Sequence, residues 1–127
     1  MKMKTIMKNN KREIKKVLNK AIENCPDYEK IEVFTWVNNC WCEELGAHES
    51  YRVMVHLHGV KDENSEYGAY KNSELLTWKE TLVLDSEDTD EHNKAMYQSF
   101  RATKELTEWC KTNFDRVMDV EDWIFYF

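Results

Sequence analysis

The sequence predicts an α+β fold, with one domain over residues 1–127 in which two helices pack on one face of an antiparallel sheet of three to five strands. Two segments carry apolar residues at helical spacing, and three others are rich in β-branched and aromatic residues. Along the chain these elements follow the order α-β-β-β-α-β. The apolar fraction of 42% suffices for a packed core, while one proline and three glycines are too few for a linker between domains.

The first predicted helix covers residues 10–25. Its apolar residues form one stripe with lysines opposite: Ile14, Val17, Leu18, Ala21, Ile22 and Cys25. Asn9 or Asn10 can cap its start. Pro26 ends it, because the residue before a proline is pushed out of the α region. Residues 1–8 are expected to be either flexible or an edge strand.

Three strands are predicted next, over residues 31–42, 51–60 and 74–84. The second alternates strictly, so that its apolar residues share one face. In the third strand, four residues are predicted to share a face: Leu76, Trp78, Leu82 and Leu84. The connections 43–50 and 61–73 are predicted to be loops, and Gly46 in the first of them can adopt a positive φ.

The second helix is predicted over residues 88–113, with Met96, Phe100, Leu106, Trp109 and Cys110 on its buried side. The segment 119–127 ends in WIFYF and is predicted to be a closing strand or a tail packed on the sheet. Together with the three earlier strands, it completes the expected sheet.

The cysteines and histidines of the first hairpin are candidate zinc ligands, because two Cys and two His on neighbouring strands can form a tetrahedral site. The predicted register places Cys42 near Tyr51, which puts Cys40 and Cys42 on one face and His56 and His58 on the other. The spacings C-x-C and H-x-H also differ from those of zinc sites. No metal site and no cofactor are therefore predicted.

The net charge of −6 hides a strong division along the chain. Residues 1–20 carry eight Lys or Arg and one acid, whereas residues 21–127 carry ten Lys or Arg and 23 acids. An acidic body of this kind repels nucleic acid and anionic membranes and favours basic partners. The same charge is also typical of a surface that serves solubility alone.

The stretch LDSEDTDEH, residues 84–92, holds five carboxylates. A helix start explains Asp88, Asp90 and Glu91, because anions are favoured in the first turn by roughly 0.3–1 kcal/mol each. An EF-hand loop is excluded, because glycine is missing from its sixth position and glutamate from its twelfth. Three other connections are acidic as well, and carboxylates spaced like phosphates would mimic a nucleic acid.

Sequence motifs give no catalytic residue. There is no phosphate-binding loop, dinucleotide fingerprint, nucleophile elbow or H-E-x-x-H. Cys25, Cys40 and Cys110 lie on predicted apolar faces, where the pKa of a thiol rises. No apolar run of about 18 residues and no secretory signal is present, so the expected location is the cytoplasm.

The leading hypothesis is a non-enzymatic acidic binding protein that inhibits or masks a basic, nucleic-acid-handling protein without binding nucleic acid or membrane itself, as a monomer or homodimer. In size and charge it resembles phage-encoded inhibitors of host defence nucleases, which act in the host cytoplasm, and immunity proteins of nuclease toxins. No residue role is carried over from this likeness. The predicted partner-binding residues are Trp41, Glu43, Glu44, Glu49, Asp62, Glu63, Glu66, Tyr67, Glu87, Asp88 and Asp90.

Two alternatives stay open. Arg52, His56 and His58 on one strand face could bind a phosphate or carboxylate, which would make the chain a small-molecule binder or an enzyme. A structural subunit is the other alternative, with the aromatic tail pairing across a two-fold axis.

Overall fold

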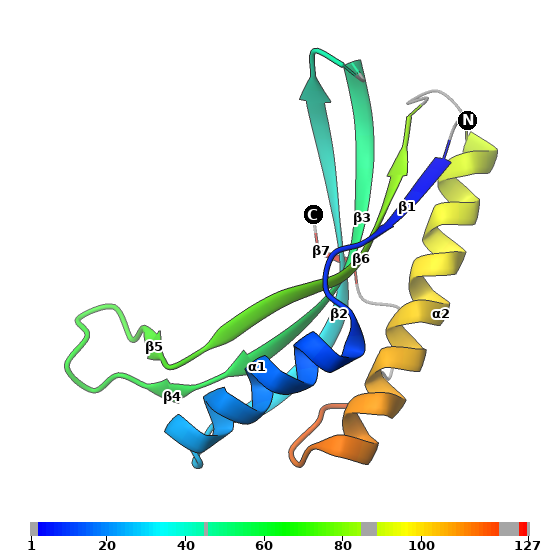
Figure 1. Ribbon diagram of the computed structural model, residues 1–127. Coiled ribbons are helices and arrows are strands. Elements are labelled where there is room, and N and C mark those ends of the chain that lie inside the picture. Colours follow the sequence, from blue (N-terminus) through cyan, green and yellow to red (C-terminus); the bar gives the residue numbers. More distant parts are fainter. Residues whose placement is uncertain (1–2, 45, 85–88, 120–124, 127) are drawn as a thin grey trace.

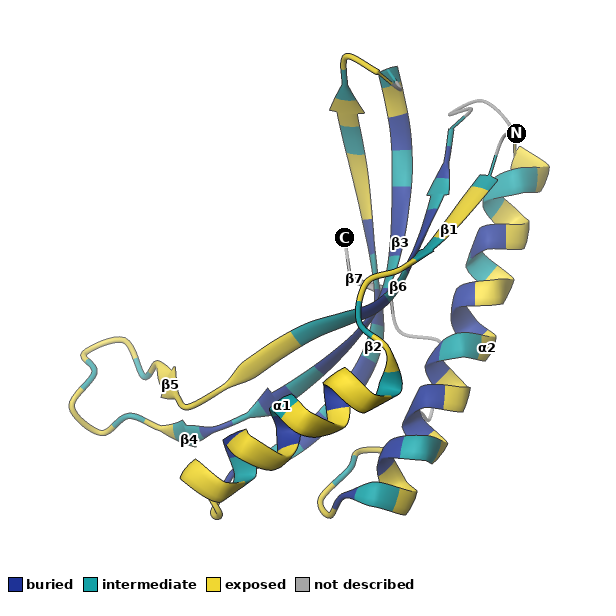
Figure 2. Ribbon diagram, in the orientation of Figure 1, coloured by how far each residue is buried: buried dark blue, intermediate teal, exposed yellow. Residues whose placement is uncertain are grey.

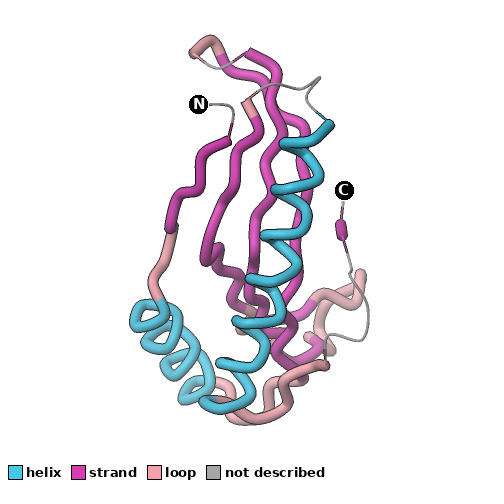
Figure 3. Tube along the Cα trace, turned by 90° about the vertical axis from the view of Figure 1, so that its right-hand side faces the viewer, coloured by secondary structure: helices cyan, strands magenta, loops and turns pink. Residues whose placement is uncertain are grey.

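The computed structural model describes residues 3–44, 46–84, 89–119 and 125–126. Their fold is α+β, as predicted, with both helices on one face of a curved sheet (Figure 1, Figure 3). The main sheet has the strand order β1-β6-β3-β2-β7, in which β7 is parallel to β2 and all other pairs are antiparallel. The elements are β1 (Met3–Met7), α1 (Lys11–Asn24), β2 (Lys30–Cys42), β3 (Gly46–His58), β4 (Val60–Lys61), β5 (Tyr70–Lys71), β6 (Glu74–Val83), α2 (Thr89–Asn113) and β7 (Phe125–Tyr126).

Helix α1 begins and ends as its sequence predicts. The Asn10 side chain accepts a hydrogen bond from the Glu13 N–H at 2.8 Å, and the Glu13 carboxylate accepts one from the Asn10 N–H at 3.2 Å. Ile14 and Leu18 are fully buried against the sheet, while the lysine side of the helix faces solvent (Figure 2). Before this helix, β1 pairs with β6 and forms an edge of the sheet.

Helix α2 packs on the sheet through small side chains as well as large ones. The hydroxyls of Thr103 and Thr35 lie 2.7 Å apart, which joins the helix to β2 inside the core. Thr107 in turn donates to the Thr103 carbonyl at 2.7 Å. Of the predicted buried residues, Met96 and Trp109 are only half-buried, because these hydroxyl residues occupy the middle of the contact face.

The β2–β3 hairpin is longer than predicted, and its register differs. Strand β3 begins at Gly46 (φ +67°), so the expected loop over 43–50 is wrong beyond residue 45. Cys42 lies opposite Gly46 rather than Tyr51, and Cys40 lies opposite His48. Polar residues in this half of β3 resemble a loop in sequence, although they continue the strand.

This register also corrects the predicted placement of the cysteines and histidines. Cys40 shares its sheet face with His56 and His58, because residues of one parity point to the same side. The two histidines lie opposite Glu32 and Lys30, at the far end of the hairpin from Cys40. Among the described residues, no three His, Cys, Asp or Glu side chains come together as metal ligands.

A β-bulge in β6 overturns the predicted face of its second half. Val53 pairs with Lys79 and Met54 pairs with Thr77, so Trp78 is an additional residue in β6. Beyond the bulge, the inward and outward positions of β6 exchange. Val83 is therefore buried, whereas Leu82 lies on the opposite face from Leu76 and Trp78.

The remaining segments complete both ends of the molecule. Within the predicted loop 61–73, β4 and β5 form a short ribbon. It requires glycine at position 59, where a Cβ atom would lie 1.9 Å from the Lys71 carbonyl oxygen. From the predicted closing strand 119–127, β7 pairs with β2 in parallel, and residues 120–124 and 127 lie outside the described part of the chain. No helix in the described part is long and apolar enough to span a membrane.

Candidate functional site

The β2–β3 hairpin extends beyond the rest of the sheet and presents an exposed tryptophan. Strand β6 accompanies β3 only as far as Glu49, which pairs with Val83. Past that point, within the described part of the chain, the two hairpin strands pair only with each other (Figure 1). Trp41, one of the predicted partner-binding residues, lies there opposite Ala47 and is 71% exposed. Large exposed aromatic side chains of this kind are enriched at the centres of protein interfaces.

Acidic residues lie near this tryptophan in the hairpin. Between Val33 and Tyr51 the chain has three glutamates, Glu43, Glu44 and Glu49, and no lysine or arginine. Two of them, Glu43 and Glu44, are exposed in the hairpin turn. The first turn of α2 adds two more acids, Asp90 and Glu91, of which Glu91 lies 3.6 Å from Lys94. We call this region the hairpin end, defined as Trp41, Glu43, Glu44, Glu49, Asp90 and Glu91.

A contact between Glu49 and His92 joins α2 to the hairpin. Nδ1 of His92 lies 2.6 Å from the Glu49 carboxylate, and the buried Tyr51 hydroxyl donates to the same carboxylate at 3.0 Å. Burial raises the pKa of Tyr51 strongly, and the hydrogen bond to Glu49 and its negative charge raise the pKa further. The first turn of α2 is thereby held beside the hairpin strands. His92 had no role in the sequence interpretation, since its partner lies 43 positions away.

The other predicted contact residues lie at the opposite end of the molecule. Asp62, Glu63, Glu66 and Tyr67 belong to the connection between β4 and β5, which leaves the main sheet away from the hairpin turn (Figure 1). Strands β2 and β3 have 13 residues each between the two regions. At about 3.3 Å per residue, the separation is on the order of 40 Å. The predicted residues thus form two acidic regions, and Glu87 and Asp88 lie outside the described residues.

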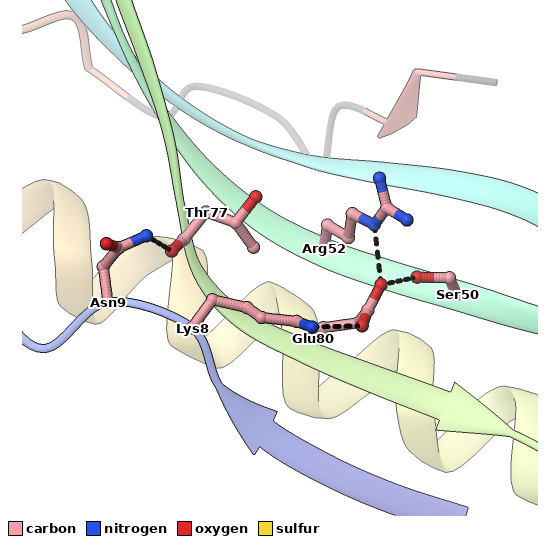
Figure 4. Close-up of polar contacts among 6 residues, drawn as sticks. All are labelled: Lys8, Asn9, Ser50, Arg52, Thr77 and Glu80. Atoms are coloured by element: carbon pink, nitrogen blue, oxygen red, sulfur yellow. Dashed lines mark hydrogen bonds and ion pairs between the residues drawn. The ribbon is translucent and has the colours of Figure 1, made fainter.

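A buried carboxylate, which the sequence interpretation missed, lies on the sheet face away from the helices (Figure 4). Glu80 is 6% exposed and accepts hydrogen bonds from the Ser50 hydroxyl and from Nε of Arg52, both at 2.7 Å. Nζ of Lys8 lies 3.4 Å from its other oxygen. The bulge at Trp78 is what turns Glu80 to this face, opposite Arg52.

These neighbours determine the charge state of Glu80. Burial alone would raise its pKa, but the hydrogen bonds from Ser50 and Arg52 and the charges of Arg52 and Lys8 outweigh burial, so the pKa is lowered. An open cavity of about 500 Å³ adjoins the cluster and is lined by Lys8, Asn9, Arg52, Leu75, Leu76, Thr77 and Glu80. Because Arg52 and Lys8 both contact Glu80, the cluster joins β3 and β6 to the residue that follows β1.

The alternative anion site is not assembled. Arg52 contacts Glu80 and is separated from His56 by four residues, about 13 Å along a strand. The rings of His56 and His58 lie 3.8 Å apart between centroids, and Glu32 is 3.9 Å from His58. Burial lowers the pKa of both histidines, and the charge of Lys30 adds to this, while Glu32 opposes it. Neutral imidazoles give little attraction to an anion.

The histidine pair gives a prediction about pH. Because the folded pKa of each is lowered, stability is fully present above the unfolded pKa of about 6.5 and is lost as pH falls toward the folded value. We expect the melting temperature to fall between pH 7.5 and pH 5, and the double variant His56→Gln/His58→Gln to flatten this part of the curve. Thermal melts of both proteins across that range, at constant ionic strength, test it. Parallel curves would contradict the prediction.

The cysteines add no reactive group to the core. All four are free, and Cys25 and Cys110 are buried. Burial raises the pKa of both thiols, to about 12 for Cys110. Cys40, predicted to lie on an apolar face, is instead half-buried on the sheet face away from the helices.

Comparisons with known protein families, with curated proteins and with solved structures found no match for this chain.

Proposed function

We propose that this chain is a non-enzymatic acidic binding protein that masks a basic, nucleic-acid-handling protein through the hairpin end. The observation that carries the proposal is the exposed Trp41 beside Glu43 and Glu44 on a projecting hairpin. An exposed indole supplies a large apolar contact, and the surrounding carboxylates select a positively charged surface and accelerate encounter with it.

The hairpin end is favoured over the acidic region between β4 and β5 for two reasons. Its strands are paired up to Cys42 and Gly46, so Trp41 is held on a preformed surface next to the turn that carries Glu43 and Glu44. Glu43 and Glu44 also have no lysine or arginine near them in sequence, whereas the β4–β5 region is flanked by Lys61 and Lys71. Tyr67 is more exposed than Trp41, at 93%, and belongs to a connection without strand pairing.

A nucleic-acid-handling protein is the proposed partner because such proteins carry clustered Lys and Arg on the surface that contacts phosphates. Carboxylates at the hairpin end would occupy that surface and so inhibit a nuclease or a defence protein. The likeness in size and charge to phage-encoded inhibitors of host nucleases and to toxin immunity proteins supports this partner class, with action in the cytoplasm of the producing or host cell.

Capture from a nuclease-treated extract tests the proposal. We expect immobilised protein to retain basic proteins, with an isoelectric point above about 9, and to release them as salt rises to about 0.5 M, where exposed charges are screened. The double variant Glu43→Gln/Glu44→Gln should retain less of these basic proteins. The matched control at the other acidic region, Glu63→Gln/Glu66→Gln, should retain as much as the wild-type protein. The proposed function would be refuted if the captured proteins are not basic. It would also be refuted if retention does not change with salt concentration or in either variant.

A further inference from the structure

The outer edge of β2 is only partly covered by other strands. The Ile31 N–H donates to the Arg116 carbonyl and the Ile31 carbonyl accepts from the Met118 N–H, both at 2.9 Å, so the backbone groups of Ile31 point away from β3. In an antiparallel pair every second residue has this orientation. Because the β2–β3 register has no bulge, Asn39 and Trp41 also point their N–H and C=O groups outward.

Strand β7 covers this edge at Thr35 and Trp36, and the described residues form no β2–β7 pair beyond Trp36. None of the described residues pairs with the outer side of Asn39 or Trp41. An open edge of this kind is a template for a further strand, and proteins usually protect it with lysine, proline or a bulge. The segment VNNCWC, residues 37–42, has none of these three protections.

We propose that the outer edge of β2 at Asn39 and Trp41 binds an extended basic segment of the partner as an added β-strand. This inference rests on the proposed function and specifies how the hairpin end recognises its partner. The added strand would exchange up to four hydrogen bonds with Asn39 and Trp41. Its alternate side chains would lie beside the Trp41 indole and reach Glu43 and Glu44 in the turn.

Charge favours a basic segment over a second copy of this chain at the same edge. Glu43 and Glu44 are exposed in the turn next to this edge, and residues 31–51 contain no lysine or arginine, so two hairpins paired edge to edge would place like charges together. Lysine or arginine at alternate positions of an incoming strand removes that repulsion and pairs with the glutamates instead. Main-chain bonds would then give affinity, and the charges would give selectivity.

The test uses the full chain and a synthetic peptide that alternates lysine and valine over eight residues. Two matched peptides carry N-methyl groups, one on every valine and one on every lysine, so each keeps the charge but loses the N–H donors of one edge. We expect the plain peptide to bind in low salt. One of the two methylated peptides should bind at least tenfold more weakly, because the added strand uses a single edge.

Two readouts on the protein locate the contact. Amide exchange at Asn39 and Trp41 should slow when the plain peptide binds, whereas Asn38 and Cys40, whose amides face β3, should not change. The variant Asn39→Pro removes one outward donor at an edge position where proline is tolerated, and it should weaken peptide binding about tenfold relative to Asn39→Ala. A thermal melt of each variant confirms that the hairpin is intact.

Each outcome decides the inference. Equal binding of all three peptides, with no change in exchange at Asn39 and Trp41, refutes strand addition and leaves a charge-based contact of the proposed function standing. Absence of binding by every peptide also refutes it, while capture of basic proteins from extract decides the proposed function separately. Self-association of the chain that competes with the peptide would assign the edge to a second copy.

Discussion

Replacing Glu80 with alanine is expected to lower the free energy of unfolding by about 3 kcal/mol, the lower end of the range for removing one partner of a buried ion pair. The variant leaves Arg52 without its carboxylate and leaves the fully buried Ser50 hydroxyl without its acceptor. Arg52 and Lys8 keep some contact with solvent, which limits the loss. For a chain of this size the melting temperature should fall by about 10 °C. Urea denaturation and thermal melts measure both quantities.

Two further variants serve as controls: one removes only the charge of Glu80, and the other removes an exposed acid elsewhere. Glu80→Gln keeps an acceptor for the Ser50 hydroxyl, so its free energy of unfolding should fall less than that of Glu80→Ala. Glu66→Ala removes an exposed acid at the far end of the molecule and should change stability by less than about 0.5 kcal/mol. A loss for Glu80→Ala as small as that of Glu66→Ala would show that the cluster does not stabilise the sheet.

The dependence of this effect on pH has a defined sign. The folded pKa of Glu80 is lowered, because its hydrogen bonds and cations outweigh burial. Its contribution is therefore present above the unfolded pKa of about 4.3 and is lost as pH falls through the folded value. The difference in stability between the wild-type protein and Glu80→Ala should accordingly narrow in acid.

Glu80 also illustrates what the sequence could not predict. Strict alternation along 74–84 places Leu82 beside Leu76 and Trp78, whereas the bulge at Trp78 exchanges the two faces beyond it. A single extra residue costs little locally and leaves no clear mark in composition. The buried carboxylate follows from that bulge, so it could not be selected among 24 acids in the sequence.

The helices and the strand centres were predictable, because their patterns are local. Asn10, Pro26 and the apolar stripe between them determine α1 within one stretch of chain. The hairpin register was not predictable, because it depends on the position of the turn. The predicted loop 43–50 has Gly46 near its middle, whereas in the structure Gly46 begins β3. The polar residues His48 and Ser50 are buried in the strand, which residue type alone does not indicate.

The candidate site was predictable only in part. Trp41 was chosen as a contact residue correctly as far as its exposure goes, but the exposure arises because the hairpin extends past β6, which the sequence does not indicate. Which acidic segments lie together did not follow, because that depends on the length and direction of the strands between them. The sequence does not distinguish the acids of the hairpin end from those of the β4–β5 region. In the structure, the 13-residue strands β2 and β3 separate the two regions.

Replacing Trp41 with alanine is expected to weaken binding to the captured basic partner by about 2 kcal/mol or more, roughly 30-fold, as for an aromatic residue at the centre of an interface. The fold should be unaffected, because the indole is 71% exposed and buried contacts are few. Calorimetric titration of the wild-type and variant proteins measures the change, with thermal melts to confirm an intact fold. Most of the loss should be in the dissociation rate, since Trp41 carries no charge.

Tyr67→Ala is the matched control, because Tyr67 is an even more exposed aromatic residue next to acidic side chains at the opposite end of the molecule. It should leave affinity unchanged if the hairpin end is the contact surface. Glu43→Lys/Glu44→Lys should instead slow association and reverse its salt dependence, because charges at the rim act on encounter. If Tyr67→Ala weakens binding and Trp41→Ala does not, the contact lies at the β4–β5 region, and the inferred strand addition at β2 fails with it.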